Sequence, residues 1–199
     1  MFPLLSLIPH FLFAFLASFE LLNFAKILQF KLHFSWLAMA VPAILGWLTW
    51  FFLNRALKKS GSQYLAVQAG ALMLISLYID LLGNLTSFYG QWFWYDKFAH
   101  FFGGVSTVAV LFALLQHWQK LGKIRLPLVW LAIFAISLSM LAGMLYEFEE
   151  YFEDYFTGTD KIGNRFDTAD DLLYQSIGAS ITAGALTFFI KRKNNKKQF

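Results

Sequence analysis

Six long apolar runs constrain the fold of this 199-residue chain more than any other feature. They lie near residues 2–22, 34–53, 65–82, 98–115, 126–146 and 172–190, and few of their residues are charged. Runs of this length are enough for a helix to cross a hydrocarbon core. Unpaired backbone amides in lipid cost several kcal/mol each, so each run should be helical. The sequence therefore predicts an all-α, polytopic membrane helix bundle of about six helices, with residues 1–199 forming one membrane domain.

The composition supports the same class. Hydrophobic residues make up 58% of the chain and charged residues only 14%, whereas about a quarter of the residues in soluble domains are charged. No cysteine is present, which excludes disulfides, Cys-ligated zinc and thiol catalysis. The basic residues form no single patch, so the net charge of +4 does not indicate nucleic-acid binding. The partner implied by this composition is the lipid bilayer.

Lys and Arg residues indicate the orientation. Most of them lie in the second connection, the fourth connection and the basic tail 191–199, which all fall on one side of a six-span topology. The positive-inside rule then predicts that both termini are cytoplasmic. Lys26 and Lys31 fall on the other side in this topology. The first run has no Lys or Arg before it, unlike a signal peptide, and is predicted to be a retained span.

All twelve acidic residues fall at the outer ends of spans or in outer connections, and three clusters of them could carry chemistry. The first cluster opens the fourth run, where Asp96 and His100 are four residues apart. On a helix they would share a face, so the carboxylate could orient the imidazole or ligate a cation with it. The alternative is an Asp helix cap and a His that is hydrogen-bonded inside the bundle.

The second cluster is Tyr146–Asp154, at the outer end of the fifth run. Glu147, Glu150 and Asp154 follow the spacing i, i+3, i+7 and line one stripe of a helix, while Glu149 and Glu153 line another. Like charges this dense persist when they are hydrated, protonated or neutralised by a cation. Glu147 lies closest to the apolar run and is the stronger site candidate, whereas a solvated helix end explains Glu149 and Glu153.

The third cluster, Gly163–Asp171, leads into the sixth run. Asp167 and Asp171 are again four apart, and Gln175 continues their face. The alternative for Asp167 is a helix cap, since acids are favoured in the first turn. Small residues between Gly178 and Gly184 predict close packing against a neighbouring helix.

Acidic helix ends at one membrane face predict a shared site for a divalent cation. Oxygen ligands suit Mg²⁺, Ca²⁺ or Mn²⁺, and a histidine also admits zinc. The leading prediction is a site that binds such a cation and binds or acts on an envelope lipid or phosphorylated headgroup. The predicted metal ligands are Asp96, His100, Glu147, Glu150 and Asp171; the predicted catalytic residues are Asp96, His100, Glu147, Asp167 and Asp171; the predicted substrate-binding residues are Lys97, Arg165 and Gln175.

At these clusters the chain resembles the YjdF-like bacterial inner-membrane proteins and, more loosely, the VanZ-like superfamily. Tyr95-Asp96-Lys97 with His100-Phe101, Tyr146-Glu147 with Glu150, and Asp167-Thr168-x-x-Asp171 before Ile177-Gly178-Ala179 resemble the three motifs of the former. Gln175 and Glu150 depart from the VanZ-like pattern, which has Asn and Gln there, and this favours the YjdF-like branch. The resemblance implies a small polytopic protein of the bacterial inner membrane, and it implies no reaction.

Two other functions stay open. The first is a cation- or proton-coupled transporter, for which Glu20 and Asp80 are the only acids that lie partly within spans. These two could also join the acidic site or lie at the interface. The second is a non-catalytic structural or partner membrane protein, whose acids only solvate the outer face.

Overall fold

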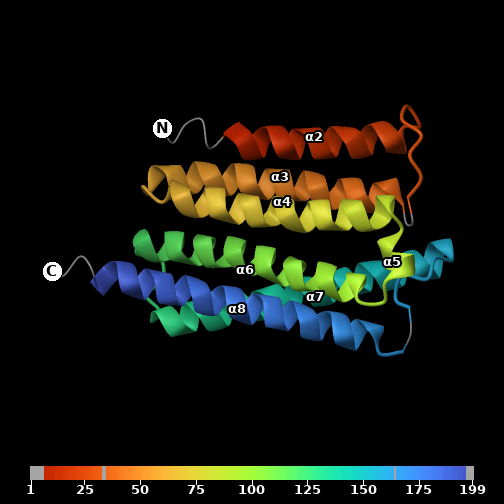
Figure 1. Cartoon of the computed structure of the whole chain (residues 1–199). Helices are drawn as coiled ribbons and strands as arrows, with labels where there is room; N and C mark the ends of the chain where they lie inside the picture. Colours follow the sequence, from red (N-terminus) through yellow and green to blue (C-terminus); the bar gives the residue numbers. More distant parts are fainter. Residues whose placement is uncertain (1–6, 33–34, 164, 196–199) are drawn as a thin grey trace. The chain divides into compact units, whose positions relative to one another are not determined.

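The computed structural model describes residues 7–32, 35–163 and 165–195, and these residues form helices without a β-strand (Figure 1). Six of the helices are long enough and apolar enough to cross a membrane. This confirms the predicted all-α polytopic bundle. In chain order the helices are α2 (Leu7–Phe24), α3 (Trp36–Lys59), α4 (Gln63–Leu85), the short α5 (Phe88–Gln91), α6 (Tyr95–Lys120), α7 (Leu128–Thr157) and α8 (Asp167–Asn195).

Most helices extend beyond the predicted apolar runs. α7 ends at Thr157 rather than near residue 146, and α3 ends at Lys59 rather than near residue 53. Backbone hydrogen bonding continues where the chain leaves lipid, so hydropathy marks only part of each helix. The predicted starts of the first and second runs, at residues 2 and 34, lie outside the described residues, as does the end of the basic tail.

The chain divides into two compact units, residues 1–99 and residues 100–199, and the boundary falls inside α6. The single membrane domain and the cytoplasmic location of both termini remain predictions.

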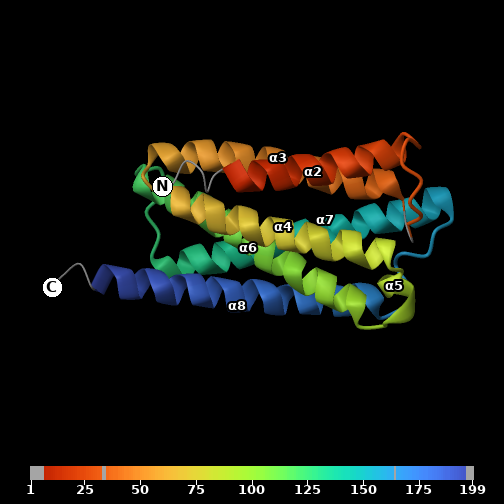
Figure 2. The same ribbon diagram turned by 45° about the horizontal axis from the view of Figure 1, so that its top comes forward.

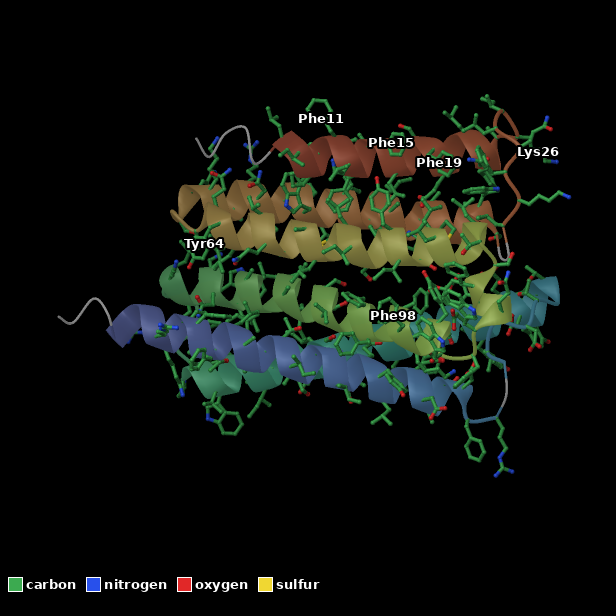
Figure 3. All side chains as sticks on the ribbon, in the orientation of Figure 1. Phe11, Phe15, Phe19, Lys26, Tyr64 and Phe98 are labelled. Carbon is green, nitrogen blue, oxygen red and sulfur yellow. The ribbon has the colours of Figure 1, made fainter. Side chains whose placement is uncertain are left out.

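The first unit packs α2, α3 and α4 side by side (Figure 2). Leu16, Met39, Ala43 and Leu81 belong to its apolar core. The outer surface of α2 carries exposed phenylalanines such as Phe11, as expected for a face that contacts lipid (Figure 3). The core of this unit is therefore apolar and its outer surface is apolar too.

The second unit packs α6, α7 and α8 around a core from all three helices, which includes Val108, Phe112, Leu131 and Ala179. Glycines allow the close approach of α6 and α8. A Cβ atom added to Gly104 of α6 would collide with the backbone carbonyl of Gln175, and one added to Gly178 of α8 would collide with the backbone carbonyl of Phe101.

The small residues of α8 confirm the predicted packing in part. Gly178, Ala179 and Ala183 are buried, but Ser180 is exposed, and a Cβ atom added to Gly184 would meet nothing within 4 Å. The tight crossing of α6 and α8 therefore lies toward the start of α8, near its acidic residues.

Candidate functional site

His100 lies one helical turn before Gly104 on α6, and its side chain is buried. The tight glycine crossing fixes this part of α6 against α8. A buried imidazole at such a crossing can reach side chains of both neighbouring helices. Its ring also lies edge-on to Tyr146 of α7, with 5.9 Å between ring centroids.

Glu147 and Glu150 of α7 face this imidazole. The Nδ1 atom of His100 lies 3.7 Å from Oε1 of Glu147, and Glu147 is only 4% exposed. One donor atom each from His100, Glu147 and Glu150 lies within 4.8 Å of the other two, and all three residues are buried. The i, i+3 spacing predicted to line one stripe of the helix therefore brings both glutamates to the same group.

Asp171 of α8 reaches the opposite nitrogen of the same ring. Its Oδ2 atom lies 4.0 Å from Nε2 of His100, and the residue is 2% exposed. One turn later the Gln175 side-chain amide donates a hydrogen bond of 2.7 Å to the backbone carbonyl of Ser139 on α7. Gly143 makes room for this amide, because a Cβ atom there would collide with it. Gln175 thus ties α8 to α7 directly behind the acidic cluster.

We call His100, Glu147, Glu150 and Asp171 the His–carboxylate cluster. It contains three carboxyl groups and one imidazole, so protonation of the imidazole alone cannot balance three ionised carboxylates. Buried like charges require protons, hydrogen bonds or a cation. The arrangement is therefore chemically suited to bind a cation.

Lys161 supplies one positive charge close to this cluster. It lies in the connection between α7 and α8, is 8% exposed, and places its Nζ atom 2.6 Å from Oε2 of Glu153. Burial works to lower the pKa of Lys161, but the hydrogen bond to Glu153 and the charges of Glu149, Glu153 and Glu150 outweigh burial and raise that pKa above its usual value. The lysine therefore stays protonated at neutral pH.

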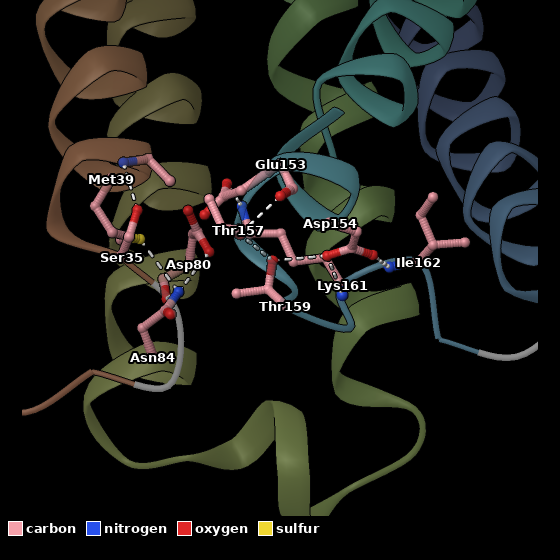
Figure 4. Close-up of polar contacts among 11 residues, drawn as sticks. Ser35, Met39, Asp80, Asn84, Glu153, Asp154, Thr157, Thr159, Lys161 and Ile162 are labelled. Carbon is pink, nitrogen blue, oxygen red and sulfur yellow. Dashed lines mark hydrogen bonds and ion pairs between the residues drawn. The ribbon is translucent and has the colours of Figure 1, made fainter. Parts of the chain in front are cut away.

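Asp154 holds the connection between α7 and α8 in place (Figure 4). Its carboxylate accepts hydrogen bonds from the backbone N–H groups of Lys161 and Ile162, each at 2.9 Å, and from the hydroxyl of Thr159 at 2.8 Å. The predicted stripe of three acids thus divides: Glu147 and Glu150 face His100, while Asp154 shapes the loop.

Glu149 is exposed, as predicted for a solvated helix end. Glu153 differs from that prediction because it pairs with Lys161. The position of the lysine along a loop gave no helical spacing from which the pair could be inferred.

The remaining predicted site residues are Asp96, Lys97, Arg165 and Asp167. Asp96 and Lys97 belong to the first unit, on the turn of α6 that precedes His100, and their side chains form an ion pair of 3.9 Å. Arg165 is exposed, with its guanidinium 4.4 Å from the centroid of the Phe166 ring. Asp167 is buried at the start of α8, against Gly163, which adopts a left-handed conformation with φ of +66°.

Two features of the site were missed by the sequence analysis: the buried Lys161 and the link between Gln175 and Ser139. A serine within an apolar run and a lysine in a loop carry no distinctive pattern. Ser139 is fully buried. Its contact with Gln175 depends on how α7 packs against α8, which the sequence does not show.

A family model described as a predicted membrane protein family, DUF2238, matches residues 8–192. The chain belongs to this family. YjdF-like proteins are the proteins associated with this family, so the predicted YjdF-like resemblance is confirmed, whereas the VanZ-like resemblance remains a prediction. No curated protein and no solved structure matches the chain. The family description gives a membrane protein and no activity.

Proposed function

We propose that this membrane protein binds a divalent cation at the His–carboxylate cluster and uses it to bind or transform the phosphorylated headgroup of an envelope lipid. One observation carries the proposal: buried donor atoms of His100, Glu147 and Glu150 lie within 4.8 Å of one another. Asp171 approaches the other nitrogen of the same imidazole. The location in the bacterial inner membrane is part of the proposal.

The donor set favours particular metals. Carboxylate oxygens suit Mg²⁺, Ca²⁺ and Mn²⁺, while imidazole nitrogen suits zinc and other transition metals. A cluster with one nitrogen and several oxygens fits Mn²⁺ or Zn²⁺ better than the purely oxygen-ligated Mg²⁺ and Ca²⁺. Each of these ions would also offset two of the three carboxylate charges. Bound metal would act as a Lewis acid toward a phosphoryl oxygen.

The surroundings support a headgroup at this end of the second unit. Tyr151, Phe152, Tyr155 and Phe156 of α7 are exposed beyond the cluster, and aromatic side chains are enriched at the level of lipid headgroups. The exposed Arg165 lies in the connection that follows. Its planar guanidinium could contact a phosphate with two hydrogen bonds.

The proposed roles follow from these positions. His100, Glu147, Glu150 and Asp171 would hold the metal, and a carboxylate of the cluster could act as a general base toward water. Asp167, predicted from the sequence as catalytic, supports the ligands from the adjacent turn of α8, and Asp96 remains a catalytic and metal-ligand prediction from the sequence. Arg165 contacts the anionic headgroup, and Lys97 remains a substrate-binding prediction from the sequence. Gln175 positions Asp171, because its amide is engaged with Ser139.

The test of cation binding is the metal content and metal-dependent melting of the detergent-purified protein. We expect Mn²⁺ or Zn²⁺ to raise the melting temperature, since a ligand at about 100 times its dissociation constant stabilises by about 2.7 kcal/mol. Glu147→Gln, Glu150→Gln and Asp171→Asn should each lose most of this shift. Glu149→Gln and Asp170→Asn are matched controls, because each removes the same charge from the neighbouring position.

Equal losses in the controls and the cluster variants would show that general surface charge, and no defined site, causes the effect. If metal does not raise the melting temperature of the unaltered protein, the proposal is overturned.

The test of headgroup binding incubates the metal-loaded protein with phospholipids and isoprenyl phosphates. Binding or phosphate release that requires metal and fails in Asp171→Asn is the expected result.

One observation favours a second candidate function. Glu20 is buried inside a candidate membrane span of the first unit, and intramembrane acids are common in proton- or cation-coupled transporters. The alternative of a non-catalytic partner protein predicts that substitutions throughout the His–carboxylate cluster leave both metal binding and cell phenotype unchanged.

A further inference from the structure

Glu20 of α2 is a buried carboxyl group in the first unit, away from the proposed cation site in sequence and in its surroundings. Its side chain is only 1% exposed, and it lies one turn after Leu16 and Ala17 of the apolar core. Among the described residues, its Oε2 atom is fully buried and has no hydrogen-bond partner. Nor does the Glu20 carboxyl form an ion pair with any described residue. An ionised carboxylate in this position would be strongly disfavoured.

The charge of Asp80 on α4 acts on the Glu20 carboxyl group. Asp80 is in a different environment, because its Oδ1 atom accepts hydrogen bonds from the Tyr89 hydroxyl at 2.7 Å and from the Asn84 amide at 3.1 Å. The Asn84 amide also lies 3.1 Å from the sulfur of Met39 on α3 (Figure 4). Hydrogen-bond donors therefore stabilise a negative charge on Asp80, whereas no described residue donates a hydrogen bond to the buried Oε2 atom of Glu20.

In the described structure, helices α3 and α4 bring no positive charge to Glu20. The charged residues of α3 are Arg55, Lys58 and Lys59, all near its opposite end. On α4, Tyr78 also interacts electrostatically with Glu20, but its hydroxyl is directed to the backbone carbonyl of Leu12. On α2 itself, His10 lies more than two turns away and accepts a hydrogen bond from Trp47. Two carboxyl groups in one apolar site do not both ionise readily.

We propose that Glu20 and Asp80 form a proton-binding site in which Glu20 carries one exchangeable proton and Asp80 is ionised. The ligand is the proton itself, and the site is independent of the metal cluster of the second unit. The proposal stands on the burial of Glu20, its missing hydrogen-bond partner and the contrasting donors around Asp80.

The experiment is infrared difference spectroscopy of the full-length protein in lipid, comparing unaltered protein with Glu20→Gln at neutral pH. A protonated carboxyl group absorbs separately from a carboxylate. We expect Glu20→Gln to lose one protonated-carboxyl band, and Asp80→Asn to retain it. Exchange into D₂O should shift this band in the unaltered protein. Asp96→Asn serves as a control for removal of an acid elsewhere in the unit and should also retain the band.

Melting provides a second measurement that distinguishes a proton from a metal cation. Gln resembles a protonated Glu, so Glu20→Gln should melt within a few degrees of the unaltered protein. Loss of a carboxylate band, and not a protonated-carboxyl band, in Glu20→Gln would overturn the proposal. So would a stabilisation by Na⁺, relative to choline, that is present in the unaltered protein and absent in Glu20→Gln. Both measurements are independent of Mn²⁺ or Zn²⁺ binding, so the two proposals can fail separately.

Discussion

Both units of this protein bury carboxyl groups near the ends of their helices, but the surroundings of those groups differ. In the second unit, an imidazole lies 3.7 Å from one carboxylate and 4.0 Å from another, and Lys161 interacts with the same acidic region. In the first unit, Glu20 has an acidic neighbour and no hydrogen-bond partner for one oxygen among the residues that the structure describes. The first arrangement offers ligands to a metal, and the second offers a place for a proton.

The difference shows what acidic residues in a membrane bundle require. A metal site needs several donor atoms within reach of one point, and these must come from helices that approach one another closely. Glycines provide that approach in the second unit, where Gly104 and Gly178 each face a backbone carbonyl of the other helix. A proton site needs only a buried carboxyl group that lacks hydrogen-bond donors and a positively charged partner. The following variants test whether this contrast holds, from the largest expected effect to the smallest.

The helix crossing beside His100 should be most sensitive to a single added methyl group. In Gly104→Ala the new Cβ atom would collide with the carbonyl of Gln175, so α6 and α8 must separate. Overpacking of this kind costs about 1–3 kcal/mol. We therefore expect a lower melting temperature and weaker Mn²⁺ or Zn²⁺ binding.

Gly103→Ala is the matched control for this variant, because a Cβ atom there would meet nothing within 4 Å. Alanine is also the better helix former, so the control should melt at the same temperature or slightly higher. Metal binding that survives in Gly104→Ala as well as in Gly103→Ala would show that the crossing does not hold the site together.

The sequence predicted the six helices because their apolar runs are long and nearly free of charge. It could not predict their ends: α7 continues to Thr157, where Asp154 accepts a hydrogen bond from the connection to α8. It predicted that Glu147 and Glu150 share a face, since that follows from helix spacing alone. It could not show that Gln175 pairs with Ser139, because this depends on the register between two helices.

A smaller effect is expected from the hydrogen bond behind the cluster. Gln175→Met keeps a similar volume but removes the amide that donates to the carbonyl of Ser139. A hydrogen bond of this kind contributes about 0.5–1.5 kcal/mol. The variant should unfold more readily by about that amount and bind Mn²⁺ less tightly.

Ser176→Ala provides the comparison on the neighbouring exposed side of α8, where the hydroxyl donates within its own helix to Leu173. It should change neither property measurably. A Gln175→Met protein with unaltered metal affinity would show that the link between α7 and α8 stabilises the unit without positioning Asp171.

Lys161 should make the stability of the second unit depend on pH in the alkaline range. Its pKa is raised in the folded protein by Glu153 and the neighbouring glutamates, despite the opposing effect of burial. The stabilisation is therefore complete below the pKa of an unfolded lysine, about 10.4, and is lost as the pH rises through the higher folded value. Lys161→Met should lack this part of the alkaline loss, which melting between about pH 10 and pH 12 would measure.

Lys123→Met is the control for that measurement, because Lys123 is exposed in the connection between α6 and α7. It should show the same alkaline loss as the unaltered protein. An identical pH profile for Lys161→Met would mean that the ion pair with Glu153 does not contribute to stability.

The smallest effect on stability is expected from Arg165, although the proposed headgroup site gives it a role in binding. The side chain is exposed and its guanidinium lies over the ring of Phe166, and an exposed cation–π contact is worth about 0.5–1 kcal/mol. Arg165→Ala should therefore melt within a few degrees of the unaltered protein while its affinity for vesicles that contain phosphorylated lipids falls several-fold. Arg192→Ala is the control, because it removes an exposed arginine near the other end of α8. If the headgroup binds near the His–carboxylate cluster, this variant should keep the affinity of the unaltered protein for the same vesicles. Equal losses of affinity in both variants would indicate general attraction of basic residues to anionic lipid, and the contrast between the two units would then rest on their buried groups alone.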